Sequence, residues 1–201
     1  RHINVRWERI SSMAKVNVIC DLETTGVDAG CCILSIALVP FDTDYPLDTF
    51  YETVSYEDSK IQGFQDDPDT LAWWDKQKPE IQAEAFSGTR KIRDVLESVS
   101  FYLATLGEPK DIILWGNGKD FDNVILGYAF KKLGIKQPWS FRNNRCYRDL
   151  TANYPMLPKG EVIGAHNALN DALAQAKHAE IIMNAVRNLG GIIPETLRRQ
   201  M

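Results

Sequence analysis

Two carboxylates close the first apolar run of the chain and are the first candidates for chemistry. Asp21 and Glu23 follow the short β-branched stretch at residues 16–22, which predicts a buried strand. Side chains two apart on a strand share a face, so these carboxylates would lie side by side. Their repulsion calls for a cation, and hard oxygen ligands select Mg²⁺ or Mn²⁺. The alternative is a pair of solvated acids entering a turn at Thr25 and Gly26.

A second group of polar residues joins an expected strand to an expected helix. Gly116 and Gly118 allow a sharp turn or a close approach to a ligand. Asp120 and Asp122 come near the helix start, where acidic residues cap the helix and complement its dipole. We assign the cap to Asp120 and a metal-binding role to Asp122.

A third group opens the long C-terminal helix that the sequence predicts. His166 precedes this helix and Asp171 lies one turn inside it, so both side chains can reach a cleft near its first turn. An imidazole can be neutral at neutral pH, as a general base must be. Of the other two histidines, His2 lies in a doubtful leader and His178 is predicted to be structural.

The elements that would position these groups follow from hydrophobic periodicity. Three strands at 16–22, 33–41 and 48–54 predict an antiparallel meander, and a fourth strand is expected at 111–115. Strands followed by alternating strands and helices indicate a mixed sheet flanked by helices. Residues 140–150 are ambiguous, with a possible helix start at 149–150. The predicted helices are two short ones within 71–85 that divide near Pro79, then 89–106, 122–133 and 165–189.

The composition is that of a single globular domain. The chain has 201 residues, of which 44% are hydrophobic and 25% charged. We expect one domain at 13–201, with residues 1–12 a leader or vector-derived, although a genuine N-terminal arm is the alternative. No run approaches a membrane span. Four cysteines without CxxC spacing predict reduced thiols in a cytoplasmic protein.

Charge is spread unevenly along the chain, whose net charge is −4. Residues 41–70 hold nine acidic residues and one basic residue, whereas residues 131–160 hold seven basic residues and one acidic residue. This pattern indicates either solvated loops or a basic rim that faces a polyanion.

Taken together, the three groups resemble a known family. A DxET motif, then Phe121-Asp122 after a Gly/Asn turn, then an HxxxxD motif is the pattern of the DEDDh 3′–5′ exonucleases, the DnaQ-like branch of the ribonuclease H-like fold. The chain is most similar to small phage exodeoxyribonucleases and related bacterial exoribonuclease-like domains. Residues 71–74, 77–80 and 157–160 support this subgroup, and the match loosens across 142–154. The resemblance implies an α/β fold with a mixed five-stranded sheet, in which three strands form the antiparallel meander and the others are parallel.

The resemblance also implies the roles of the site residues. Asp21 would bridge two divalent ions, Glu23 and Asp171 would hold the first ion, and Asp122 would support the second. His166 would be the general base. The enzyme would release nucleoside 5′-monophosphates, with Mg²⁺ or Mn²⁺ as cofactor.

Substrate contacts implied by the resemblance lie after the first strand and in the basic segment. The turn Thr24-Thr25-Gly26 would meet the terminal 3′ hydroxyl, and Trp74 would stack on a base, with one of Trp73 and Trp74 packing inward. Single-stranded DNA or 3′ overhangs are the favoured partners. The alternatives are an exoribonuclease, a non-catalytic nucleic-acid-binding module and a metal-dependent phosphatase. The candidate phosphate contacts are Lys119, Arg145, Arg148 and Lys159.

Overall fold

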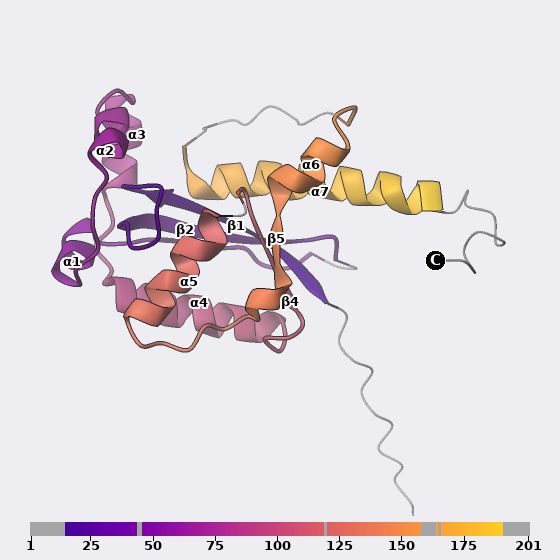
Figure 1. Ribbon diagram of the computed structural model, residues 1–201, viewed down its shortest axis with the longest axis horizontal. Helices are drawn as coiled ribbons and strands as arrows, with labels where there is room; N and C mark the ends of the chain where they lie inside the picture. Colours follow the sequence, from indigo (N-terminus) through magenta and orange to yellow (C-terminus); the bar gives the residue numbers. More distant parts are fainter. Residues whose placement is uncertain (1–14, 44–45, 119, 158–163, 165, 191–201) are drawn as a thin grey trace, which may run out of the picture.

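A five-stranded mixed sheet forms the centre of the computed structural model, which describes residues 15–43, 46–118, 120–157, 164 and 166–190 (Figure 1). The strand order is β3-β2-β1-β4-β5. β1 pairs antiparallel with β2, and β2 with β3, whereas β4 runs parallel to both β1 and β5. The predicted fold class is therefore confirmed. The strands are β1 (Val16–Thr24), β2 (Ile33–Phe41), β3 (Phe50–Thr53), β4 (Ile112–Gly116) and β5 (Asn144–Cys146).

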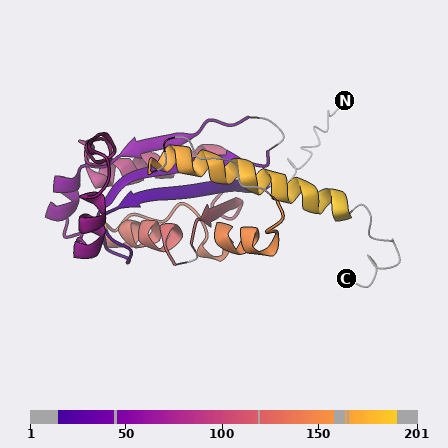
Figure 2. The same ribbon diagram turned by 90° about the horizontal axis from the view of Figure 1, so that it is seen from above.

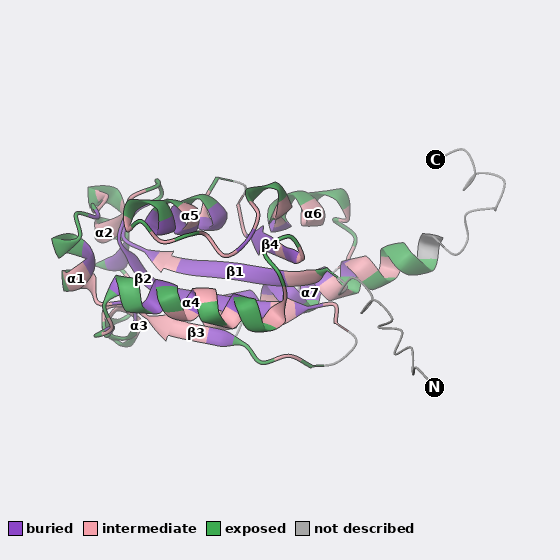
Figure 3. Ribbon diagram, turned by 90° about the horizontal axis from the view of Figure 1, so that it is seen from below, coloured by how far each residue is buried: buried purple, intermediate pink, exposed green. Residues whose placement is uncertain are grey.

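Seven α-helices surround the described part of the sheet. Figure 2 shows α7 lying along one face, and Figure 3, from the opposite side, shows α4 across the other face with its buried stripe toward the strands. The three short helices α1–α3 gather beyond the end of β1 (Figure 1). The helices are α1 (Tyr56–Ile61), α2 (Pro68–Trp74), α3 (Pro79–Ala85), α4 (Ile92–Leu106), α5 (Asp122–Lys132), α6 (Tyr147–Asn153) and α7 (Ala168–Gly190), with a 3₁₀ turn at Phe141–Asn143.

The two faces of the sheet are packed differently. Beneath α4 and α5 the core consists of large aliphatic and aromatic side chains, such as Leu38, Leu96 and Phe130. On the opposite face, α7 presents alanines spaced three or four residues apart, which bring one side of a helix against the strands. Their short side chains let α7 approach β1 and β2 closely. This alanine seam consists of Ala168, Ala172, Ala176 and Ala179.

The observed elements differ from the predicted ones mainly where they are short. The ambiguous stretch at 140–150 contains the 3₁₀ turn, β5 and the start of α6. The six-residue α1 has no counterpart in the prediction, and the side chain of Ser55 caps it by accepting from the amide of Asp58. Pro79 begins α3, as the predicted break requires.

Other sequence-based expectations concern cysteines and membranes. All four cysteines are free thiols, and three of them are buried. Within the described residues, no helix has the length and apolarity needed to cross a membrane. Residues 1–12, Lys119 and Lys159 lie outside the described part of the chain.

Candidate active site

The carboxylates of β1 face helix α7. Asp21 and Glu23 continue the alternation that places Ile19 in the core beneath α7. Asp21 is buried, with 7% of its surface exposed. The register of β1 against β2 shifts between Glu23 and Thr24, so the regular strand ends just after the second carboxylate.

Helix α7 brings two polar side chains to these carboxylates from its first two turns. Gln175 donates from Nε2 to Oδ1 of Asp21 at 2.6 Å. Carboxylate oxygens of Asp21, Glu23 and Asp171 all lie within 4.8 Å of one another. The sequence motifs predict the three acids but not Gln175. Its position four residues after Asp171, on the same face of α7, is the signal that would have found it.

Asp122 reaches the same place from the start of α5. It is 1% exposed. Its Oδ1 accepts from the amide of Leu22 at 3.2 Å, and its Oδ2 accepts from the amide of Asn117 at 2.7 Å. Gly116 is required beside it, because a Cβ there would lie 2.7 Å from Oδ1 of Asn123 and 3.1 Å from Cβ of Asp122. The backbone thus holds Asp122 against the end of β1.

The expected capping role of Asp120 is wrong. The N-cap residue of α5 is Phe121, whose side chain makes no capping hydrogen bond. Asp120 lies one residue before the N-cap and is exposed. Asp122, the first residue of the helix, accepts a hydrogen bond from the amide of Asn117 in the preceding loop. One acidic residue therefore supplies both the carboxylate of the site and the local amide contacts.

His166 lies at the entrance to α7 in a left-handed backbone conformation, with φ of 66°. Its amide donates to Oδ2 of Asp171 at 2.9 Å. The imidazole contacts the indole of Trp73 edge to face, with 4.9 Å between ring centroids. These contacts tie the exposed histidine to a carboxylate of α7 and to a ring of α2.

The carboxylates lie close enough to repel one another, and this repulsion raises their pKa values. Burial raises the pKa of Asp21 well above its ordinary value, and the charges of Asp122 and Glu23 raise it further. Burial and the charges of Asp171 and Asp122 raise the pKa of Glu23 to about 8. Burial raises the pKa of Asp122 to about 6, although the amides it accepts lower it. Within the described residues, no lysine or arginine forms an ion pair with this group.

This donor set fits divalent cations. Oxygen ligands from several carboxylates suit Mg²⁺ and Mn²⁺, and a cation would remove the repulsion that raises the pKa values. Oε1 of Gln175 is buried and has no hydrogen-bond partner in the described structure. It lies beside the bond that Gln175 makes to Asp21, where a water molecule of a hydrated ion would satisfy it.

A cavity of about 800 Å³ unites the predicted residues. Thr24, Gly26, Trp73 and Arg148 also line it. The fold therefore brings together residues from three distant stretches of the chain, as the sequence pattern predicted. The five predicted catalytic residues, Asp21, Glu23, Asp122, His166 and Asp171, are all on its wall.

Of the two tryptophans of α2, one packs inward and the other is open to solvent. Trp74 is 2% exposed, and its Nε1 donates to the carbonyl of Thr24 at 2.8 Å. Trp73 is 39% exposed beside His166. Trp74 was the residue assigned to stack on a base, but its contacts show it supporting the turn after β1, and Trp73 offers the open ring.

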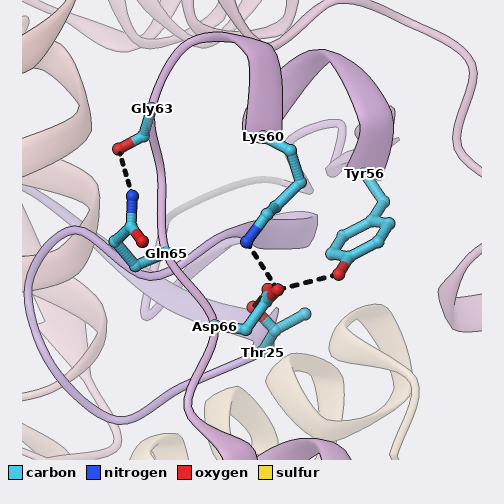
Figure 4. Close-up of polar contacts among 6 residues, drawn as sticks. All are labelled: Thr25, Tyr56, Lys60, Gly63, Gln65 and Asp66. Carbon is cyan, nitrogen blue, oxygen red and sulfur yellow. Dashed lines mark hydrogen bonds and ion pairs between the residues drawn. The ribbon is translucent and has the colours of Figure 1, made fainter.

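The turn after β1 is anchored through Thr25. Its hydroxyl donates to Oδ1 of Asp66 at 2.8 Å, and the other carboxylate oxygen of Asp66 accepts from Tyr56 and Lys60 (Figure 4). Burial raises the pKa of Asp66, but the hydrogen bonds from Lys60, Thr25 and Tyr56 hold it below its ordinary value overall. A side chain at Gly26 would collide with Cβ of Cys31 at 2.8 Å. The backbone here is consequently fixed beside the cavity.

A family model identifies the family to which the chain belongs. The model of the 3′–5′ exoribonuclease Rv2179c-like domain matches residues 16–183. The chain belongs to this exonuclease family. It is therefore a member of a 3′–5′ exonuclease family, as the sequence motifs predicted, and the acidic group is its candidate metal site.

Solved structures share the fold of this exonuclease. The nuclease domain of 3′hExo, a DEDDh family member bound to rAMP, has a TM-score of 0.61 and 18% identity, covering 87% of this chain and 94% of that one. E. coli exonuclease I in complex with a 5cy-dA13 oligonucleotide has a TM-score of 0.58 and 13% identity, covering 85% of this chain and 40% of that one.

Cell-death related nuclease 4 has a TM-score of 0.53 and 16% identity, covering 86% of this chain and 64% of that one. The chain thus spans less than two thirds of exonuclease I and of this nuclease. No curated protein sequence matches the chain.

Proposed function

We propose that this exonuclease removes nucleotides one at a time from the 3′ end of single-stranded RNA and releases nucleoside 5′-monophosphates. The observation that carries the proposal is the cluster of Asp21, Glu23 and Asp171, whose oxygens lie within 4.8 Å of one another. Asp122 and His166 line the same cavity. Four carboxylates and an imidazole are the groups that metal-assisted phosphodiester hydrolysis needs.

In the proposed mechanism, the carboxylates of Asp21, Glu23, Asp122 and Asp171 would hold two divalent ions, with Asp21 placed among the other acids. Two Mg²⁺ or Mn²⁺ ions bound there would lower the pKa of water and stabilise negative charge on the leaving oxygen. His166 takes a proton from the attacking water and, being exposed, passes it to solvent. The water oxygen bonds to phosphorus as the bond to the 3′ oxygen breaks, and that oxygen takes up a proton.

The surroundings of the cavity support attack at a chain end. The turn that Thr25 and Trp74 fix lies at the cavity wall, and Trp73 stands exposed beside it. We assign the terminal nucleoside to this corner, with Trp73 against its base. Stacking of this kind contributes about 1–3 kcal/mol per base.

The choice of RNA over DNA rests on the family. The matching model describes exoribonucleases, whereas the sequence analysis favoured DNA on its likeness to phage enzymes. Among the solved relatives, one is bound to rAMP and another to a DNA oligonucleotide. DNA is therefore the alternative substrate.

The decisive experiment is digestion of RNA and DNA oligonucleotides of matched sequence, labelled at the 5′ end or the 3′ end. We expect 3′-labelled mononucleotides to be released first, faster from RNA, and only with Mg²⁺ or Mn²⁺. Cleavage that persists in chelator would contradict the metal mechanism, and internal fragments would contradict exonuclease action. Faster hydrolysis of a small phosphate ester would favour the phosphatase.

A further inference from the structure

Two smaller hollows continue from the catalytic cavity along β4, β5 and α6. The first, which we call the middle hollow, measures about 360 Å³ and shares Gly118, Phe121 and Arg148 with the catalytic cavity. The second, the far hollow, measures about 400 Å³ and shares Cys146 and Asp149 with the middle hollow. The shared residues place the three hollows next to one another in a row that begins at the proposed metal site.

Two arginine side chains line these hollows. Arg148 stands on the wall common to the catalytic cavity and the middle hollow, and Arg145 lines the far hollow. Both are exposed, and neither forms an ion pair within the described residues. The guanidinium of Arg145 is held by hydrogen bonds to the carbonyls of Arg142 and Asn144. Both arginines lie in the basic segment at 131–160.

The walls of the far hollow suit a nucleotide. Leu150 supplies an apolar surface there, and the amides of Asn144 and Asn153 line it as well. Asn144 accepts from Nε1 of Trp139 through Oδ1, and Asn153 donates to the carbonyl of Asp149 through Nδ2, so the Nδ2 of Asn144 and the Oδ1 of Asn153 are the atoms offered to a base. Bases of single strands bind apolar or guanidinium planes and use amides for hydrogen bonds to their edges. Asp149 lines the same hollow, and its negative charge would repel a phosphate there. Arg145 would attract the phosphates of a bound strand, so the two residues have opposite effects on binding.

We propose that the strand on the 5′ side of the scissile bond leaves the catalytic cavity past Arg148 and follows the middle hollow to the far hollow, where Arg145 contacts its phosphates. This inference rests on the proposed exonuclease function. The terminal nucleoside fills the corner beside Trp73, so the rest of the strand requires a path. The two hollows lie next to the cavity, and Arg148 and Arg145 line them. Grooves that follow a single-stranded backbone combine positive charge with surfaces for bases in this way.

The test compares a dinucleotide, which fills only the catalytic cavity, with an octanucleotide of the preferred sugar. Three single variants alter the far hollow: Arg145→Gln, Arg145→Lys and Asp149→Asn. Arg142→Gln is the matched control, because it removes a cation from the same basic segment at a residue that lines none of the three hollows. For each enzyme, kcat and KM are measured with both substrates across a salt series.

We expect Arg145→Gln to raise KM for the octanucleotide about tenfold, with little change for the dinucleotide, and to reduce the salt slope by about 0.7. Arg145→Lys should restore most of the loss, and Asp149→Asn should lower KM for the octanucleotide, which a damaged fold cannot do. Equal effects of Arg145→Gln and Arg142→Gln, or equal effects on both substrate lengths, would overturn the proposed path. Failure of the unaltered protein to digest either substrate would overturn the exonuclease function itself.

Discussion

At the scale of single residues, the site depends on how each buried carboxylate is held. Asp122 accepts hydrogen bonds from the amides of Leu22 and Asn117, and burial of its carboxylate raises its pKa. Its geometry therefore comes from the backbone, and its charge is available to a cation. Backbone amides thus position the side chain of Asp122, and its charge serves to bind a cation. Replacing Asp122 by Asn removes the charge and separates these two roles.

We expect Asp122→Asn to lower kcat on a dinucleotide by roughly 100-fold or more. In chelator its Tm should change little, because relief of repulsion among the carboxylates offsets the loss of one of the two amide hydrogen bonds that Asp122 accepts. Initial rates and thermal unfolding measure the two effects. Asp120→Asn is the comparison and should keep most of the dinucleotide activity, since Asp120 is exposed and outside the carboxylate group. A larger loss in Asp120→Asn would reverse our assignment of the two acids.

Gln175 provides a second test at this scale. Replacing it by Met removes the donor that holds Oδ1 of Asp21, so we expect affinity for Mn²⁺ to fall about tenfold. Calorimetric titration with Mn²⁺ measures this without turnover. Gln65→Met is the control, because the side chain of Gln65 contacts the carbonyl of Gly63 away from the cavity (Figure 4). Unchanged affinity in Gln175→Met would show that Asp21 needs no such support.

The sequence identified charged site residues better than it identified their supports. Asp21 and Glu23 could be found because two carboxylates at strand spacing after an apolar run are unusual. The inward turn of Trp74 could not be assigned, because either member of a tryptophan pair fits the core. The role of Asp120 was misjudged even though the predicted helix start at residue 122 is correct, because Phe121 occupies the N-cap position and the neighbouring acid, Asp122, accepts the amides of Leu22 and Asn117.

At the scale of elements, the contact between the loop before α4 and the end of β3 tolerates no side chain. A Cβ on Gly88 would lie 2.2 Å from the carbonyl oxygen of Val54, which is backbone and cannot move aside. This contact helps hold the α1–α3 group against the sheet, and so it also bears on the position of α2 and its tryptophans.

Gly88→Ala should therefore destabilise the protein by about 3 kcal/mol, as overpacking does. Urea denaturation followed by circular dichroism measures the change. Gly107→Ala is the matched control and should alter stability little, because its nearest neighbour would be Cβ of Asp111 at an ordinary 3.6 Å and its backbone is extended. Similar stabilities for the two variants would mean that the loop before α4 can shift.

Long periodic elements were predictable, as were the short α2, α3 and β3, whereas α1 and β5 were not. The stripe of buried residues along α4, including Ile92, Leu96 and Leu103, repeats with the period of a helix and defines it locally. β5 has only three residues and exists because β4 pairs with it. Three residues carry no period, so pairing between distant segments decides such a strand.

At the scale of the whole molecule, the buried carboxylates link stability to pH and metal. The raised pKa of Glu23, about 8 against an ordinary 4.5, means that the folded protein holds more protons than the unfolded chain between those pH values. Stability without metal must then fall as the pH rises through this window, because the charged form is favoured in the unfolded state. A cation that binds only the folded state offsets this loss.

We accordingly expect Tm in chelator to decrease between about pH 4.5 and pH 8, and Mn²⁺ to raise Tm more at pH 8 than at pH 5. Differential scanning fluorimetry across this range measures both. Glu23→Gln should flatten the decrease, since it removes a titrating group. A Tm that stays level in chelator, or an equal Mn²⁺ effect at both pH values, would contradict the link.

The alanine seam of α7 acts as a spacer for the whole enzyme. Four one-carbon side chains set the gap between helix and strands, and that gap fixes how far Asp171 and Gln175 stand from Asp21. Larger side chains in the seam would increase the distance between α7 and the sheet. The proposed metal ligands on the helix and on β1 would then be too far apart to bind the same ion. Mutations that contact neither nucleotide nor ion can therefore silence this nuclease from within its scaffold.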